Sequence, residues 1–209
     1  FKKGMAFMPI CFGISFTKTF MNQARALVHV YTDGSINVST GAVEMGQGVN
    51  TKMLQVAASI FSVDPSLVSV LTTSTFRIAN TSPSAASATA DLNGRATQIA
   101  CEAILKRLKI VAAEELKTEI SSIEIKDEEV FVNGKVSELT WKKLVMASYV
   151  RRISLSEHAH YTPDDIHFDN SIEKGNPFTY HVYGTGIFTV TIHCIRGTYE
   201  FDSVSIVHL

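Results

Sequence analysis

An Asp-Gly pair between two β-favourable runs is the feature that most narrows the fold of this chain. The runs are residues 26–31 and 35–40, and Asp33-Gly34 stands between them. Such a pair readily adopts the positive φ angles of a tight two-residue turn. The sequence therefore predicts a β-hairpin near the start of the chain.

Two later stretches show the apolar period of an amphipathic helix. The first follows Gly48 and ends before Asp64-Pro65, where the proline favours a turn. The second covers about residues 91–109. The residues expected on the two buried faces are Val49, Met53, Val56, Ala57 and Ile60, and then Leu92, Ala96, Ile99, Ala103 and Ile104.

The remaining segments are mostly strand-like. Strands are expected over residues 67–73 and 154–161, and hairpins over 123–135 and 185–208. Their turns fall near Asp127-Glu128, in a solvated acidic run that continues to Glu129, and at Arg196-Gly197.

A third helix is expected through Trp141, with Ser137 as its N-cap. Residues 162–178 resemble a loop, in which Gly175-Asn176-Pro177 is read first as a turn. Strands and helices alternate without Rossmann spacing or an internal repeat. We therefore predict an α+β fold, with mixed sheets, hairpins and two to three packed helices.

Composition excludes several classes of function. The 209 residues contain 19 basic and 20 acidic side chains, a net charge of −1, which gives no electrostatic case for binding nucleic acid or an anionic membrane. No apolar run approaches the roughly 18 residues that a membrane-spanning helix needs. Charged residues make up 19% of the chain, below the usual figure of about 25%, so some surface is expected to face other protein.

The three cysteines, Cys11, Cys101 and Cys194, are far apart and odd in number. They form no CxxC pair and no disulfide framework, so buried, reduced thiols of a cytoplasmic protein are expected. Ligation of an iron–sulfur cluster within this chain is excluded, since such clusters usually need four cysteines.

The segment Glu44-Met45-Gly46-Gln47-Gly48 leads directly into the first helix. Its glycines allow positive φ and the close approach of a ligand. Free N–H groups of the helix N-terminus would favour a phosphate or another anion, and Gln47 can offer both a donor and an acceptor. The alternative is an ordinary glycine-rich entry to a helix, because the pattern is neither a P-loop nor GxGxxG.

Residues 81–90, TSPSAASATA, open the second helix and are almost all small. Such a run lets a ligand lie against the main chain, with the hydroxyls of Ser84, Ser87 and Thr89 as partners. A flexible linker is the alternative. Two small-residue loops that each open a helix suggest that both grip one anionic ligand.

Other candidates are weaker. His158 and His160 share a face of a predicted strand and could bind a metal, but no third ligand is evident and a solvent-facing pair is favoured. Phe12, Phe16 and Phe20 are more typical of a core than of a surface that stacks on a substrate.

Taken together, the motifs resemble the molybdenum-binding part of xanthine dehydrogenases. FGISFTKTFMNQARALVHVYTDGS, EMGQGVNTKMLQVAA, NTSPSAASATADLNGRA, RISLS and GNPFTYHVYGTG occur in the family's order. EMGQG and ADLNG are shared with aldehyde oxidases, whereas FGISFT and NTSPSAAS are more similar to the xanthine dehydrogenase branch. The resemblance covers residues 1–209 as one partial molybdopterin-binding domain, except for about residues 110–139, which match no motif of the family.

The resemblance implies which residues hold the cofactor. Met45, Gly46 and Gln47 would lie at the cofactor, with Gln47 near the molybdenum. A second group would wrap the pterin and its phosphate, with Ala86 nearest the metal and no side chain ligating it directly. This group is Ser84, Ala85, Ala86, Ser87 and Thr89. Phe16 and Thr17 would line the purine pocket, where an aromatic face and a hydroxyl suit a flat heterocycle.

The chain departs from the family pattern in two respects. Gly41-Ala42-Val43 stands where the family usually has Gly-Gly-Thr. The family's catalytic glutamate, in a VGEPP-like segment, has no counterpart here and is expected beyond Leu209. The chain is therefore expected to be a fragment that carries no catalytic residue of its own.

The expected function is a share in a molybdenum hydroxylase that oxidises hypoxanthine, xanthine or a related N-heterocycle. The family adds 2Fe-2S clusters and FAD in other domains or subunits, and the complete enzyme is expected to be a homo-oligomer. The alternative is a catalytically incompetent structural or assembly module. Its purified chain would contain neither molybdenum nor a pterin.

Overall fold

A computed structural model describes residues 1–71 and 73–209 of the chain. The chain divides into two compact units, one made of residues 1–19 and 165–209 and the other of residues 20–164. We describe each unit by itself.

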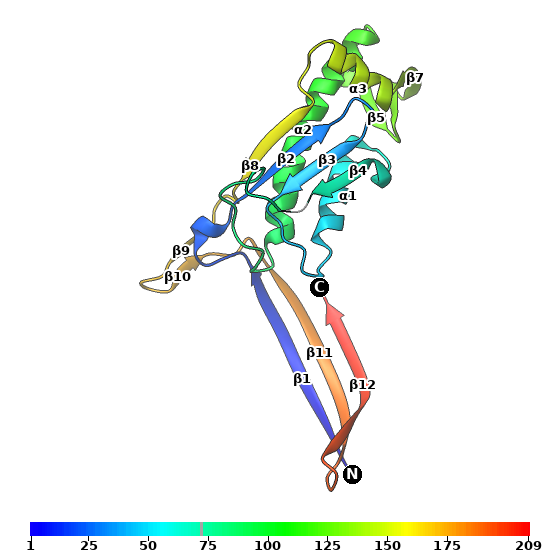
Figure 1. Cartoon of the computed structure of the whole chain (residues 1–209). Helices are drawn as coiled ribbons and strands as arrows, with labels where there is room; N and C mark the ends of the chain where they lie inside the picture. Colours follow the sequence, from blue (N-terminus) through cyan, green and yellow to red (C-terminus); the bar gives the residue numbers. More distant parts are fainter. Residues whose placement is uncertain (72) are drawn as a thin grey trace. The chain divides into compact units, whose positions relative to one another are not determined.

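The unit of residues 20–164 contains a four-stranded sheet in the order β4-β3-β2-β8 (Figure 1). Its strands are β2 (Ala24–Val30), β3 (Ile36–Thr40), β4 (Val68–Leu71) and β8 (Ser156–Tyr161). β3 pairs with β4 in parallel, and β2 pairs with β3 and β8 in antiparallel fashion. The strand expected over residues 67–73 is confirmed as far as Leu71, and Thr72 lies outside the described residues.

The predicted β2–β3 hairpin is confirmed. Gly34 has a φ of 92°, which glycine adopts without steric cost. The Asp33 carboxylate accepts hydrogen bonds from the backbone N–H and the hydroxyl of Ser35, at 2.9 and 2.7 Å. These bonds lower the pKa of Asp33 and fix the turn.

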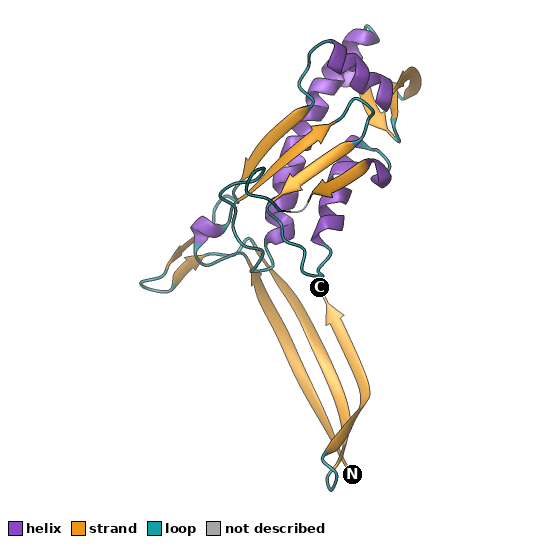
Figure 2. Cartoon of the chain, in the orientation of Figure 1, coloured by secondary structure: helices purple, strands orange, loops and turns teal. Residues whose placement is uncertain are grey.

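Helices α1 (Val49–Phe61) and α2 (Thr89–Glu115) pack on one face of this sheet (Figure 2). Most of the predicted apolar positions face the core. Val49, Met53, Ala57, Leu92, Ala96 and Ile104 are buried, and Val56, Ile60, Ile99 and Ala103 are half-buried.

Helix α2 is longer than the predicted stretch of residues 91–109. The charged residues that suggested an earlier end are accommodated at the surface, where Arg151 forms ion pairs of 2.6 and 2.7 Å with Glu114 and Glu115. Between them and the helix centre, Val111, Ala112 and Ala113 are buried. Burial of this last apolar turn extends the helix.

A second sheet of the same unit has the order β5-β6-β7. Its strands are β5 (Ile123–Lys126), β6 (Glu129–Val132) and β7 (Lys135–Thr140). The predicted turn at Asp127-Glu128 is confirmed, and both residues have positive φ, at 49° and 64°. Short 3-10 turns occur at η1 (Thr19–Met21), η2 (Pro65–Leu67) and η3 (Ile120–Ser122).

Helix α3 (Trp141–Val150) confirms the third helix, but the predicted cap was wrong. Ser137 lies within β7, and its hydroxyl accepts a hydrogen bond from the N–H of Leu139. Thr140 is the N-cap residue, because strand pairing continues up to it.

The unit of residues 1–19 and 165–209 contains a three-stranded sheet, β1-β11-β12, and a two-stranded one, β9-β10. The elements are β1 (Lys2–Ile14), β9 (His167–Asp169), β10 (Lys174–Asn176), β11 (Tyr180–His193) and β12 (Thr198–His208). The predicted β11–β12 hairpin is confirmed. At the end of β1, the hydroxyl groups of Ser15 and Thr179 are hydrogen-bonded at 2.7 Å.

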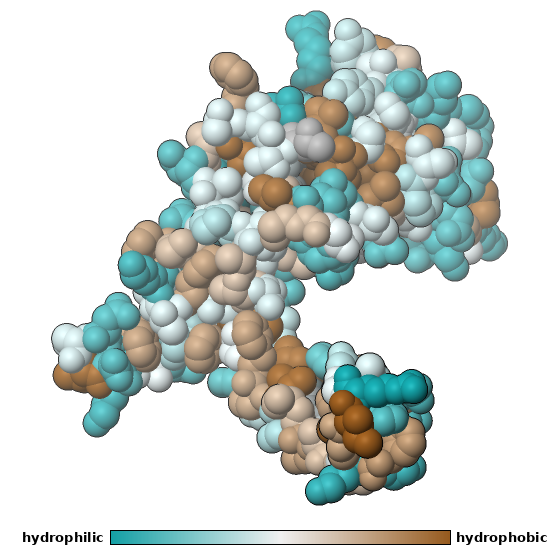
Figure 3. All heavy atoms as spheres, turned by 60° about the horizontal axis from the view of Figure 1, so that its bottom comes forward, coloured by the Kyte–Doolittle hydropathy of each residue, from teal (hydrophilic) through white to brown (hydrophobic). Residues whose placement is uncertain are grey.

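Within this unit, one face of the β1-β11-β12 sheet is strongly apolar. Antiparallel pairing places directly opposite residues on the same face. The apolar residues on this face of β1 and their apolar partners on β11 and β12 are Ala6, Met8, Ile10 and Phe12, then Val182 and Phe188, then Val204 and Ile206. Several are exposed to solvent, and hydrophobic side chains are prominent on the surface view (Figure 3).

Several expectations for residues near the chain ends were wrong. Residues 162–178 contain the β9–β10 hairpin, with Gly175 and Asn176 inside β10 rather than at a turn. Phe12 and Phe20 are 46% and 72% exposed, so they are not core residues.

The cysteine prediction holds for one residue of the three. Cys101 is buried, which raises the pKa of its thiol to about 12. Cys11 and Cys194 are exposed, because the narrow β1-β11-β12 sheet buries few side chains within its own unit. Among the helices of residues 1–71 and 73–209, none is long and apolar enough to cross a membrane.

Trp141 provides a test of the core of residues 20–164. Its indole N–H donates to the Gly34 carbonyl at 2.8 Å, and its ring contacts Phe61 at a centroid distance of 5.4 Å. Trp141→Ala should lower the free energy of unfolding by about 3–5 kcal/mol because it leaves a cavity. Trp141→Phe should cost less, about 1–3 kcal/mol, since mainly the hydrogen bond is lost. Urea denaturation measures both.

The matched control is Tyr149→Ala, on the exposed face of α3. It should change the stability by no more than about 0.5 kcal/mol. Equal losses for Trp141→Phe and Tyr149→Ala would contradict the role given to the Gly34 hydrogen bond.

Candidate functional site

The segments that precede α1 and α2 lie together at one end of the two helices (Figure 1). We call residues 41–48 the first loop and residues 81–88 the second loop. The backbone N–H of Val43 donates to the hydroxyl of Ser84 at 2.8 Å. Gly41 packs so closely on the side chain of Thr81 that a Cβ at Gly41 would collide with it. The two loops are thus joined directly.

The first loop has a further contact with Thr73, which lies outside both loops and whose hydroxyl donates to the Ala42 carbonyl at 2.9 Å. The first loop therefore uses backbone groups of Ala42 and Val43, and neither residue has positive φ. For this reason, the departure from the family's Gly-Gly-Thr leaves these links in place.

The N-terminus of α1 does not offer the free N–H groups that the sequence suggested. The Glu44 carboxylate accepts hydrogen bonds from the N–H groups of Gly46, Gly48 and Asn50, at 2.9, 2.9 and 3.0 Å. These backbone bonds lower the pKa of Glu44. A side chain of the first loop itself thus takes the place expected for an external anion.

Gln47 is also engaged within the first loop. Its side-chain oxygen accepts from the N–H of Met45 at 2.6 Å, and its amide nitrogen donates to the Val43 carbonyl at 2.9 Å. Both the donor and the acceptor of Gln47 thus shape the first loop, and their expected role toward a ligand stays a prediction.

The second loop has an unusual backbone. Ala86 and Ser87 are consecutive non-glycine residues with φ of 54° and 53°. Each such residue costs of order 1–3 kcal/mol, and such strain gathers where a backbone meets a ligand. The turn at Asp127-Glu128 shows the same pattern, so at Ala86 and Ser87 it defines the shape of the second loop.

Both loops line one pocket with a volume of about 480 Å³, within the range of small-molecule sites. Its walls are formed by Met45, Gln47, Val49, Lys52, Ser84, Ala85, Ser87, Thr89 and Ala90. Six of the eight predicted cofactor residues are in this set. Gly46 and Ala86 belong to the same loops but not to the walls.

The two residues expected at the substrate lie in the other unit. Phe16 is half-buried and Thr17 is exposed there. Their role at a substrate stays a prediction.

Glu44 and Lys52 were not among the predicted site residues. Glu44 could have been found as an acidic residue just before a helix that has none in its first turn. Lys52 lies in that first turn, where the helix dipole makes a cation unfavourable. A lysine at such a position could have drawn attention to it from the sequence.

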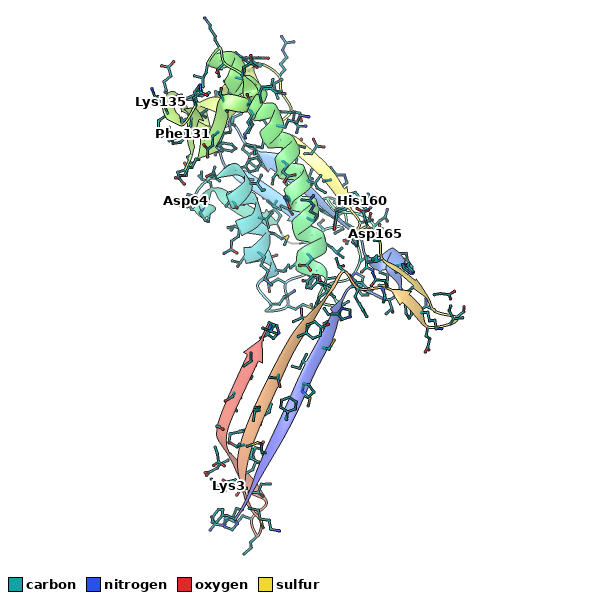
Figure 4. All side chains as sticks on the ribbon, turned by 180° about the vertical axis from the view of Figure 1, so that it is seen from behind. Lys3, Asp64, Phe131, Lys135, His160 and Asp165 are labelled. Atoms are coloured by element: carbon teal, nitrogen blue, oxygen red, sulfur yellow. The ribbon has the colours of Figure 1, made fainter. Side chains whose placement is uncertain are left out.

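The two histidines of β8 are exposed, in agreement with the solvent-facing pair that the sequence favours (His160 is labelled in Figure 4). His158 and His160 lie opposite Leu27 and Arg25 of β2. Within residues 1–71 and 73–209, no group of three or more His, Cys, Asp or Glu side chains could hold a metal ion.

Solved structures share this fold. The chain superposes on quinoline 2-oxidoreductase from Pseudomonas putida 86 with a TM-score of 0.78 and 21% identity, covering 99% of this chain and 27% of that one. It superposes on aldehyde oxidoreductase from Desulfovibrio gigas with a TM-score of 0.74 and 19% identity, covering 99% and 20%. The fold is thus that of an α+β domain within larger enzymes.

Sequence comparison is more specific. A family model described as a molybdopterin cofactor-binding domain matches residues 1–208, a span that includes the stretch of residues 110–139. Xanthine dehydrogenase 1 of Arabidopsis thaliana is 43% identical over 205 residues, which is 98% of this chain and 14% of that protein. Xanthine dehydrogenase/oxidase of Gallus gallus is 40% identical over 199 residues, which is 95% and 13%. The chain belongs to the molybdopterin cofactor-binding domain family.

Glu44 gives a pH-dependent prediction. A carboxyl group whose pKa is lowered by folding stabilises the fold above its ordinary pKa of 4.5 and loses that effect as the pH falls through the folded value. At neutral pH, Glu44→Gln should therefore have a lower thermal midpoint than the parent chain. The difference should shrink as the pH falls from about 4.5 through the lower folded pKa of Glu44, because the carboxyl group is then protonated first in the unfolded and finally in the folded state.

The control is Glu124→Gln, at an exposed position of β5. It should leave the midpoint unchanged at each pH. A difference between Glu44→Gln and the parent that stayed constant from about pH 7 to pH 3 would show that the carboxylate charge is not what holds the first loop.

Proposed function

We propose that this chain is the part of a molybdenum hydroxylase that holds molybdopterin and contributes to the pocket for a purine or a related N-heterocycle. The observation that carries the proposal is the pocket that the first and second loops line together. The xanthine dehydrogenases of Arabidopsis thaliana and Gallus gallus, at 43% and 40% identity, support the choice of substrate. An aldehyde is the second candidate, because aldehyde oxidase 2 of Mus musculus is 39% identical.

The residues present fit molybdopterin. Small side chains and strained backbone in the second loop allow a flat pterin to approach the main chain. The hydroxyls of Ser84, Ser87 and Thr89 would form hydrogen bonds with its polar groups. When bound, the group supplies the oxidation–reduction chemistry that side chains lack. Ala86 and Gln47 would be nearest the molybdenum, and Phe16 with Thr17 would orient the heterocycle.

The chain spans about 14% of the length of its plant relative, so a complete enzyme needs more protein. We propose that the other parts carry the base glutamate, the 2Fe-2S clusters and FAD, and that the whole enzyme is a homo-oligomer. A structural or assembly module without catalysis is the competing function.

The full-length protein that contains this chain separates these possibilities. Its molybdenum and pterin contents should be close to one per chain, and it should oxidise xanthine or hypoxanthine with an artificial electron acceptor. Oxidation of aldehydes alone would replace the purine with the second candidate. Full-length protein that lacks both molybdenum and pterin would favour the assembly module.

Gln47→Ala tests the first loop in the full-length enzyme. It should reduce kcat by about 10²-fold, because it removes the amide that holds the first loop in shape beside the proposed reacting centre. Gln55→Ala, an exposed change on α1, should leave kcat unchanged. Near-normal turnover of the Gln47 variant with full cofactor content would contradict the proposed position of Gln47.

Phe16→Ala tests the substrate assignment. Loss of a stacking face worth about 0.5–1.5 kcal/mol should raise KM for xanthine about 2- to 10-fold at unchanged molybdenum content. Phe20→Ala, at a position 72% exposed, serves as control. If Phe16→Ala instead lowers the amount of folded protein and leaves KM alone, Phe16 is a packing residue.

A further inference from the structure

The pocket between the first and second loops has a positive charge that the sequence analysis did not assign. Among the described residues that line it, Lys52 is the one with a charged side chain. Its other walls are apolar groups, one amide and three hydroxyls. Lys52 is therefore the residue of these walls that can attract an anionic ligand by its charge.

Folding does not explain a lysine at this position. The N–H of Lys52 donates to the Gly48 carbonyl at 3.2 Å, so the residue stands in the first turn of α1. A cation near a helix N-terminus interacts unfavourably with the helix dipole. Within residues 1–71 and 73–209, Lys52 forms no ion pair that would offset this cost.

The hydrogen bonds of Glu44 leave fewer backbone donors at α1 for an anionic ligand, so the positive charge of Lys52 matters more for binding one. A phosphate at the start of a helix usually binds the free backbone N–H groups there. At α1 the Glu44 carboxylate already accepts from Gly46, Gly48 and Asn50. A phosphate in this pocket therefore needs another positive group, and Lys52 is the charged residue among the walls of the pocket.

We propose that Lys52 binds the terminal phosphate of the cofactor, with the hydroxyl groups of the second loop as neutral donors beside it. This inference rests on the proposed function, since it takes molybdopterin as the ligand. The phosphate carries about −1.5 to −2 charges at neutral pH, and a lysine ammonium donates strong, charge-assisted hydrogen bonds to it.

The experiment uses the full-length enzyme and follows cofactor retention rather than turnover. Lys52→Ala, Lys52→Arg and the control Lys106→Ala, an exposed position of α2, are purified beside the parent. Molybdenum is quantified by mass spectrometry, and pterin release over time is followed by its fluorescence. A second measurement is the thermal midpoint of each cofactor-free protein.

Lys52→Ala should release the pterin about 10-fold faster or more, as expected when one hydrogen bond to a charged group is lost. Lys52→Arg should retain it nearly as well as the parent, and Lys106→Ala should match the parent. The cofactor-free Lys52→Ala protein should unfold at the same temperature or slightly higher, because an unfavourable charge leaves the helix start.

Two outcomes would overturn the inference in distinguishable ways. If the parent holds molybdopterin and Lys52→Ala holds it equally long, the inference alone is wrong. If Lys52→Ala loses cofactor only in parallel with a lower thermal midpoint of the cofactor-free protein, Lys52 is structural and the inference is again wrong. A parent enzyme without molybdopterin would overturn the proposed function itself.

Discussion

The contact between α1 and α2 near their N-terminal ends is the constraint on which the candidate site depends. Gly94 of α2 faces Met53 of α1, where an added Cβ would lie 3.5 Å from the Met53 methyl group. One turn later, the Thr97 hydroxyl approaches the Met53 sulfur at 3.8 Å. Both contacts lie in the N-terminal three turns of the helices, on the side from which the two loops enter and touch each other. A bulky side chain at position 94 would have to displace Met53 and would disturb the packing of α1 on α2.

The loops reach their shape with internal partners, and this decides what the pocket can offer a ligand. The Glu44 carboxylate takes three backbone N–H groups, and the Gln47 amide bridges Val43 and Met45. A site whose backbone donors are used in this way leaves the side-chain hydroxyls of its walls and Lys52 as the groups that we propose for a ligand. Preformed loops also cost less to order when a ligand arrives. The strain at Ala86 and Ser87 is compatible with this arrangement, because the surrounding contacts hold the second loop in place.

Sequence patterns predicted the parts of the structure that depend on neighbours along the chain. Asp33-Gly34 and the two apolar helical periods located a hairpin and two helices, and the two small-residue loops located most of the pocket walls. Features that depend on distant residues were missed. Arg151 pairs with the end of α2 and thus hid the helix's true length, and strand pairing up to Thr140 excluded Ser137 as a cap. The role of Glu44 is a local feature, since its partners are two to six residues away, and the sequence analysis missed it although an acidic residue just before α1 was visible.

The departure Gly41-Ala42-Val43 shows which positions of the first loop need a particular residue. At Gly41 a Cβ would strike Thr81, so a glycine is required for the two loops to touch. At Ala42 and Val43 the structure uses a carbonyl and an N–H, which every non-proline residue supplies. The methyl group of Ala42 is buried, whereas the Val43 side chain is 43% exposed and free to vary. The loop therefore tolerates changes at two positions of the family motif and keeps the contact with Ser84, because that contact depends on backbone geometry and on Gly41.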